Sequence, residues 1–224
     1  MAALEGGWVE PIYYAQAMPA NPERGRPDKG YVDIVVHDGY NQIALFSPVS
    51  SRSPVMLTSG AWEVVESAFG VDLENNMLYF VAARESPSQR HLYAVRLDGS
   101  GLRSVTDIFR QAFYNLDMDH GTHYAVLNYK GPELPRQSLA RLQNGSVECQ
   151  WELGVGNGKL ETNLKNRRLP RRTHQTIYTA GGYQLSIMEL LPADFDPKLQ
   201  YPTIFHIYGG PGSQKVNMKF EVDF

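Results

Sequence analysis

The chain has 224 residues, of which 42% are hydrophobic and 20% are charged, so it has enough apolar material for one or two hydrophobic cores. Its 21 basic and 24 acidic residues leave a formal net charge of −3, which gives no electrostatic reason to expect nucleic acid or anionic lipid as a partner. We therefore predict no nucleic-acid binding. Because the chain has a single cysteine, Cys149, it cannot form an internal disulfide, and we expect packing to stabilise the fold.

The first residues show no sign of a targeting segment. Residues 1–7 lack the basic and apolar regions of a signal peptide. No apolar run in the sequence approaches the ~20 residues that are needed to span a bilayer. If the full protein has a membrane anchor, we expect it upstream of this chain.

Three segments share a layout of short strands separated by turns. The most regular part of each segment is a predicted strand centred on a leucine, and the three leucines, Leu45, Leu92 and Leu139, are spaced by 47 residues each time. A turn and a further strand follow each one. The third of these turns is Asn144-Gly145, which is a strong signal for a type I′ hairpin.

The middle segment predicts four strands, at 62–67, 77–83, 90–97 and 102–105. A period of about 40 to 50 residues with four short antiparallel strands per unit is typical of propeller blades. A β-sandwich is the alternative, but it gives no reason for equal spacing between units. We therefore predict two near-complete blades and a partial blade at 31–58. Since a propeller needs about four blades to close its ring, we expect that blades are missing from this chain.

The repeat pattern ends near Gly154, and a basic run from Lys165 to Arg172 follows. A solvated linker is the simplest interpretation of this run, although its dibasic pairs could be cleaved by a processing protease. The next residues predict a hairpin with strands at 175–180 and 183–190 joined by two glycines. A loop at 192–197 then precedes a predicted strand at 201–208.

The strand at 201–208 ends in Tyr208 and continues into a glycine-rich loop of Gly209, Gly210, Pro211 and Gly212. In α/β-hydrolases the loop after the third strand supplies one donor of the oxyanion hole, and its glycines let the backbone approach the developing negative charge. A plain glycine turn is the alternative interpretation. No Gly-x-Ser-x-Gly motif occurs in the sequence, so we find no catalytic nucleophile, acid or base in this chain.

The glycine-rich stretch at 154–159 is not a nucleotide-binding loop. Leu153 occupies the place of the first glycine of the phosphate-binding motif, and Leu160 occupies the place of its Mg²⁺-binding Ser or Thr. The dinucleotide fingerprint fails as well, because Lys159 stands at its third glycine. We therefore predict no cofactor.

His120 and His123 lie close in sequence to Asp117 and Asp119, a combination that could bind a metal ion. These residues fall between two predicted strands, and a polar hairpin turn explains them better. We therefore predict no metal site.

Asn144 begins an Asn-Gly-Ser triplet, which is a glycosylation sequon on a predicted exposed turn. Such triplets also arise by chance. Asn144 is therefore a candidate glycosylation site if the protein enters the secretory pathway.

The chain resembles the dipeptidyl peptidase IV family of the prolyl oligopeptidase superfamily, and most closely its fungal vacuolar dipeptidyl aminopeptidases. The resemblance extends from Gly7 to the end of the chain. Its most specific stretches are GYNQIALFSP at 39–48, TSGAWEV at 58–64 and the run from Tyr201 to Gln214 that contains YGGPGSQ.

The resemblance implies a mainly β fold, in which the last blades of an eight-bladed propeller precede the truncated first strands of an α/β-hydrolase domain. The implied boundaries are 1–160 for the propeller part, 161–172 for the linker and 173–224 for the hydrolase part.

The resemblance also implies a serine exopeptidase that releases X-Pro or X-Ala dipeptides from peptides with a free N-terminus, with Tyr208 donating its hydroxyl to the oxyanion. The family's paired glutamates, which hold the substrate ammonium, have no counterpart in this sequence. We expect the chain to be inactive by itself. A non-catalytic relative that serves as a binding module is the alternative function.

For the full-length protein, the resemblance implies a homodimer in the secretory pathway, with the vacuolar membrane as its destination.

Overall fold

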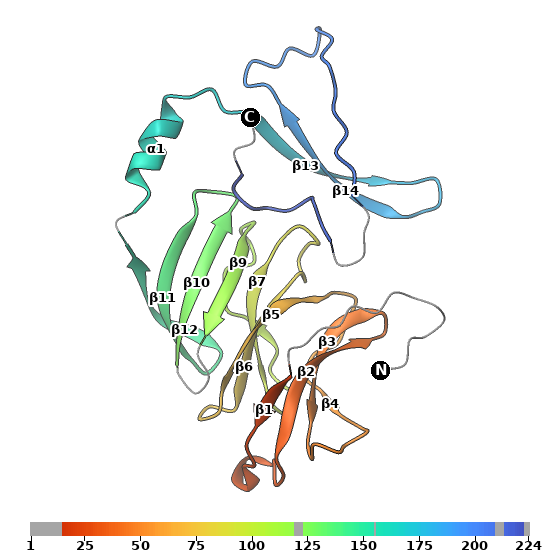
Figure 1. Cartoon of the computed structure of the whole chain (residues 1–224), viewed down its shortest axis with the longest axis vertical. Helices are drawn as coiled ribbons and strands as arrows, with labels where there is room; N and C mark the ends of the chain where they lie inside the picture. The colour runs from red at the N-terminus through yellow and green to blue at the C-terminus, as the bar shows by residue number, and fades with distance from the viewer. Residues whose placement is uncertain (1–14, 119–122, 155, 209–212, 222–224) are drawn as a thin grey trace. The chain divides into compact units, whose positions relative to one another are not determined.

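The computed structural model describes residues 15–118, 123–154, 156–208 and 213–221. The chain divides into two compact units. Of the described residues, those from 15 to 156 and Met218–Phe220 form the larger unit, and those from Asn157 to Asn217 together with Glu221 form the smaller unit. Figure 1 shows three successive antiparallel sheets followed by a helix and a hairpin.

The larger unit consists of three four-stranded sheets, each formed by strands that are consecutive in the sequence. In the first sheet the strands are β1 (Gln16–Met18), β2 (Gly30–His37), β3 (Tyr40–Phe46) and β4 (Val55–Met56). The second contains β5 (Val64–Asp72), β6 (Met77–Ala82), β7 (His91–Arg96) and β8 (Arg103–Ser104). The third contains β9 (Phe113–Met118), β10 (Tyr124–Gly131), β11 (Arg136–Gln143) and β12 (Ser146–Leu153).

The first sheet corrects the prediction of a partial blade at 31–58. It has four strands, because Gln16–Met18 pairs antiparallel with Gly30–Val32. A one-turn 3-10 helix at Pro22–Arg24 lies in the connection between these strands. Sequence patterning missed β1 because a strand of three residues is too short to show an alternating period.

The second sheet is buried on both faces. Strands β6 and β7 alternate between two hydrophobic cores, as expected from the two-residue period of a strand. The core shared with the first sheet receives Leu78, Phe80, Ala82, Tyr93 and Val95, and the core shared with the third sheet receives Met77, Tyr79, Val81, Leu92 and Ala94. Face-to-face packing of successive four-stranded sheets is the arrangement of propeller blades.

The 47-residue spacing is confirmed as a structural repeat. Leu45, Leu92 and Leu139 lie on β3, β7 and β11, which are the third strands of their sheets. The predicted turn at Asn144-Gly145 is also confirmed, since Gln143 pairs directly with Ser146. Both turn residues have positive φ, 49° and 77°, as a type I′ turn requires.

The smaller unit contains α1 (Gly158–Lys165) and a hairpin of β13 (Arg171–Tyr178) and β14 (Gln184–Leu191). The hairpin prediction is confirmed, but β13 begins at Arg171, inside the run predicted as linker. Arg171 pairs with Leu191 in the ladder while its side chain stays exposed. A basic residue can therefore join this strand without burying its charge.

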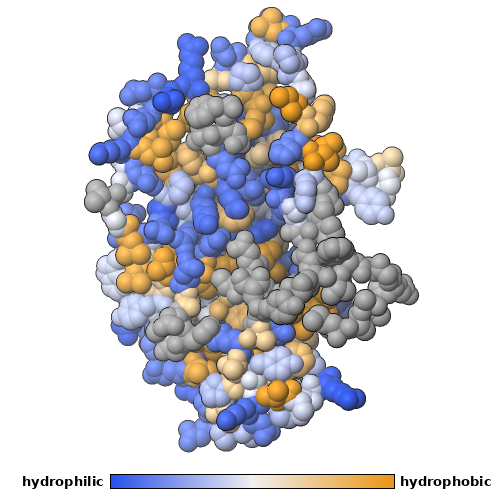
Figure 2. Space-filling view, viewed as in Figure 1, coloured by the Kyte–Doolittle hydropathy of each residue, from blue (hydrophilic) through white to orange (hydrophobic). Residues whose placement is uncertain are grey.

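Exposed apolar side chains are scattered among polar ones over the face drawn in Figure 2. Exposed apolar residues belong to both units, for example Val36 at 73% exposure in the larger unit and Tyr178 at 74% in the smaller unit. Among the described residues, the helices are too short or too polar to cross a membrane.

Candidate functional site

The segment that leads to Tyr208 is not a strand in this structure, so the prediction of a strand at 201–208 is wrong here. Its apolar side chains are largely exposed, with Ile204 at 92%, Phe205 at 82% and Ile207 at 84%. A strand that is buried on both faces of a sheet typically has a near-continuous run of apolar residues, as this segment does. No described strand pairs with this segment, and without a ladder partner its backbone cannot form a strand.

The loop before this segment contains a hydrogen-bonded turn and an aromatic contact. The amide N–H of Phe195 donates to the Pro192 carbonyl at 3.1 Å, which closes a turn at the predicted loop position. The ring of Tyr201 packs against Phe195 at 5.1 Å between centroids, and the Tyr201 hydroxyl accepts a hydrogen bond from the Asp196 N–H at 3.0 Å. Tyr201 is therefore a structural residue that orders the start of the segment.

Tyr208 lies on the surface of the smaller unit, with 57% of its area exposed. The Lys215 ammonium lies 5.7 Å from the centre of its ring, within range of a cation–π contact. This contact connects the two sides of the glycine-rich loop, whose residues Gly209, Gly210, Pro211 and Gly212 lie outside the described residues. The phenol is thus accessible rather than packed in an apolar interior.

Two of the most specific sequence stretches, 39–48 and 58–64, are close to each other within the larger unit. The Gln42 side-chain amide, which is fully buried, donates to the carbonyls of Gly60 at 3.2 Å and Trp62 at 2.6 Å. The Thr58 hydroxyl accepts from the Ile43 N–H at 2.9 Å. These contacts hold the chain as it passes from the first sheet to the second, so both stretches have a scaffolding role.

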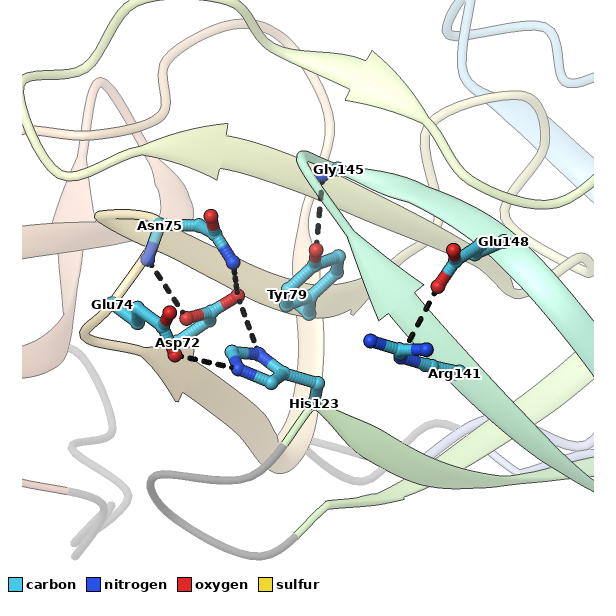
Figure 3. Close-up of polar contacts among 8 residues, drawn as sticks. All are labelled: Asp72, Glu74, Asn75, Tyr79, His123, Arg141, Gly145 and Glu148. Carbon is cyan, nitrogen blue, oxygen red and sulfur yellow. Dashed lines mark hydrogen bonds and ion pairs between the residues drawn. The ribbon is translucent and has the colours of Figure 1, made fainter.

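A polar cluster that the sequence did not predict lies between the second and third sheets (Figure 3). The Asp72 carboxylate has a side-chain exposure of 1% and accepts hydrogen bonds from the backbone N–H and side-chain amide of Asn75, at 2.9 and 2.7 Å. His123, just before β10, contacts Asp72 through Nδ1 at 3.2 Å and Glu74 through Nε2 at 2.8 Å. Only an imidazolium can donate to both carboxylates, since a neutral ring has one N–H.

His123 and Asp117, which lie close in the sequence, have different partners in the structure. The Asp117 carboxylate instead accepts from the Asn128 side-chain amide at 2.6 Å, and Asn128 accepts from Gln137 at 2.6 Å. Asp119 and His120 lie outside the described residues. Among the residues that are described, no group of three His, Cys, Asp or Glu side chains is arranged to hold a metal ion.

The hydrogen bond that His123 donates to Glu74 raises the pKa of His123 above its ordinary value, with a further contribution from Asp72. The same region contains a second contact between sheets, in which the Gly145 N–H donates to the Tyr79 hydroxyl at 3.0 Å (Figure 3). Burial raises the pKa of that hydroxyl. Both contacts join the second and third sheets, and neither has a signature in the local sequence because their partners are far apart along the chain.

Comparison with known proteins agrees with this architecture. A protein named probable dipeptidyl-aminopeptidase B from Aspergillus oryzae is 44% identical over 225 residues, covering 100% of this chain and 25% of that protein. Its namesake from Neosartorya fischeri is 44% identical over 224 residues, covering 100% and 24%. The solved structure of Porphyromonas gingivalis dipeptidyl peptidase 4 has the same fold, with a TM-score of 0.72 at 24% identity over 87% of this chain and 26% of that one.

The repeated, face-packed four-stranded sheets define this chain as part of a β-propeller protein. Residues 2–136 match the family model described as the dipeptidyl peptidase IV (DPP IV) N-terminal region. The chain belongs to the dipeptidyl peptidase IV family, and it spans about a quarter of the length of the curated relatives it matches.

Proposed function

We propose that this chain is part of a serine-type dipeptidyl peptidase that releases X-Pro or X-Ala dipeptides from peptides with a free N-terminus. The observation that carries the proposal is the 44% identity to a dipeptidyl-aminopeptidase B over the whole chain. In this proposal, residues 1–160 contribute the last propeller blades, and 173–224 begin the peptidase domain after a linker at 161–172.

Tyr208 is the proposed donor to the oxyanion of the tetrahedral intermediate. A phenol suits this role because it donates a strong hydrogen bond and remains neutral near pH 7. The exposure of Tyr208 supports the proposal, since a side chain that is 57% exposed is not enclosed in an apolar core. The adjoining Gly209, Gly210, Pro211 and Gly212 would let the loop backbone approach the same site.

The test is a Tyr208→Phe substitution in the full-length protein, assayed with an Ala-Pro or Gly-Pro amide. Loss of one oxyanion donor is expected to lower kcat by roughly 10²–10³, or about 3 to 4 kcal/mol, with little change in KM. Tyr183→Phe is the matched control, because Tyr183 is 74% exposed on the hairpin and has no proposed catalytic role. An unchanged kcat in Tyr208→Phe would contradict the assignment.

The isolated chain should release no product from either substrate, because its sequence contains no nucleophile elbow. Turnover by the isolated chain that disappears in Tyr208→Phe would refute this prediction. Absence of turnover in the full-length protein, together with saturable binding of a peptide, would instead favour the non-catalytic binding module.

We also propose that the full-length protein is a homodimer of the secretory pathway at the vacuolar membrane. Exposed Asn144 supports entry into this pathway, because it presents a sequon on a two-residue turn. Ser146→Ala removes the sequon without altering the left-handed turn residues. We expect it to reduce the mobility shift that endoglycosidase treatment causes, and a shift equal to that of the unsubstituted protein would exclude Asn144 as a glycosylated residue.

A further inference from the structure

The basic run at 165–172 contains two pairs of adjacent arginines, Arg167-Arg168 and Arg171-Arg172, which are the only neighbouring basic residues in the sequence. Both pairs have the same local chemistry. The structure places them in different backbone environments, and that difference separates a cleavable pair from a protected one.

The first pair follows the end of α1. Arg168, Leu169 and Pro170 belong to neither helix nor strand, and the Arg168 side chain is 85% exposed. Its ion pair with Asp194, at 3.7 Å, is solvent-exposed and therefore weak. A protease binds its substrate as an extended segment, which this backbone can become without breaking a strand ladder.

The last turn of α1, which precedes the first arginine pair, can also unwind locally. Helix α1 is eight residues long and contains no buried residue. At its C-terminal end, the Arg167 N–H donates to the Leu164 carbonyl at 3.0 Å. Unwinding the last turn therefore exposes no core and breaks few hydrogen bonds.

The second pair is held in the hairpin. Arg171 pairs with Leu191 and Arg172 pairs with Leu190 in the antiparallel ladder of β13 and β14. The Arg172 guanidinium also donates to the Glu221 carbonyl at 2.8 Å. Cleavage after Arg172 therefore requires the hairpin to open first.

We propose that the Arg168–Leu169 peptide bond is a site of limited proteolysis by an endopeptidase that recognises paired basic residues. In this hydrolysis, water adds across the bond. The bond between the Arg168 carbonyl carbon and the Leu169 nitrogen breaks, leaving a carboxylate on Arg168 and a free α-amino group on Leu169.

The residues around the bond define the protease. Arg168 and Arg167 would occupy two adjacent substrate pockets, and Lys165 would reach a third pocket two positions further from the cut. All three side chains are cationic, so the matching enzyme has carboxylate-lined pockets. The Lys165 side chain is 72% exposed, and its ammonium contacts Glu161 at 2.7 Å on the helix surface. Such an exposed pair is easily exchanged for a protease carboxylate.

The test is limited digestion of the folded protein with a subtilisin-like endopeptidase specific for paired basic residues, followed by mass spectrometry and N-terminal sequencing. The expected first product begins Leu169-Pro170-Arg171. Arg168→Gln should slow this cut at least tenfold, whereas Arg172→Gln, the matched control, should leave its rate unchanged. Both variants alter partly or largely exposed side chains, so they should fold alike.

A synthetic peptide spanning 163–174 separates the effect of structure from the subsite preference of the protease. The ratio of cuts after Arg168 to cuts after Arg172 should be at least tenfold higher in the folded protein than in the peptide. Equal ratios, a first cut after Arg172, or a first cut that appears only in unfolding concentrations of urea would overturn the proposal.

Discussion

His123 links the second and third sheets through a charge that depends on pH. Because the Glu74 hydrogen bond raises the pKa of His123 in the folded protein, its stabilising effect is fully present below the unfolded value of about 6.5 and is lost as the pH rises through the folded pKa. We predict that His123→Gln lowers the free energy of unfolding at pH 5 and has a much smaller effect at pH 9. Urea unfolding at the two pH values measures the difference.

Glu74→Gln is the matched control for this residue-scale prediction. The Glu74 side chain is 78% exposed, so the substitution removes the charged partner of His123 without disturbing the core. It should reduce the pH dependence while leaving the Asp72 contact in place. Equal losses of stability from His123→Gln at pH 5 and pH 9 would show that the histidine acts through packing alone.

At the scale of the elements, β6 and α1 contribute very differently to stability. Leu78 in β6 is fully buried in a core between sheets, whereas Leu160 in α1 is 38% exposed. We predict that Leu78→Ala costs about 2–5 kcal/mol of unfolding free energy, because it leaves a cavity in the core. Leu160→Ala should change stability by about 0.5 kcal/mol or less. Comparable losses in chemical denaturation would contradict the central position of the second sheet.

At the scale of the whole molecule, Met218–Phe220 returns to the larger unit from a stretch that otherwise belongs to the smaller one. The N–H of Met218 donates to the Ser88 carbonyl at 2.9 Å, and the N–H of Phe220 donates to the Lys130 carbonyl at 2.6 Å. A Cβ at Gly131 would collide with the backbone of this segment. We predict that Gly131→Ala lowers hydrogen-exchange protection of both amides at least tenfold.

Gly131→Ala is expected to displace the Met218–Phe220 segment, and Gly154→Ala is its control. Gly154 also has a positive φ, of 89°, but a Cβ there meets no atom within 4 Å. The variant should strain its local backbone and leave the Met218 and Phe220 amides protected. Loss of protection in both variants would indicate general destabilisation instead of displacement of the segment.

Much of the architecture follows from local sequence. The repeated leucines Leu45, Leu92 and Leu139 and the Asn144-Gly145 turn indicate successive units of short antiparallel strands, because strand periodicity and turn chemistry depend on neighbouring residues. Tyr208 and its glycine loop could be singled out in the same way. Their proposed role depends on a sequence pattern and stays a prediction.

Contacts between distant residues were decided only by the tertiary structure. Asp72 and His123 lie 51 positions apart, and nothing in either local sequence indicates their pairing. The apolar run at 201–208 has the composition of a buried strand, but a strand also requires a hydrogen-bonding partner, which no described residue provides. The two arginine pairs are alike in sequence, and only the ladder of β13 and β14 distinguishes them. Sequence by itself determined the repeat of the larger unit, most of its strands and the hairpin of the smaller unit. The tertiary structure decided which segments find a ladder partner and which side chains meet, because packing brings together groups that local patterns cannot relate.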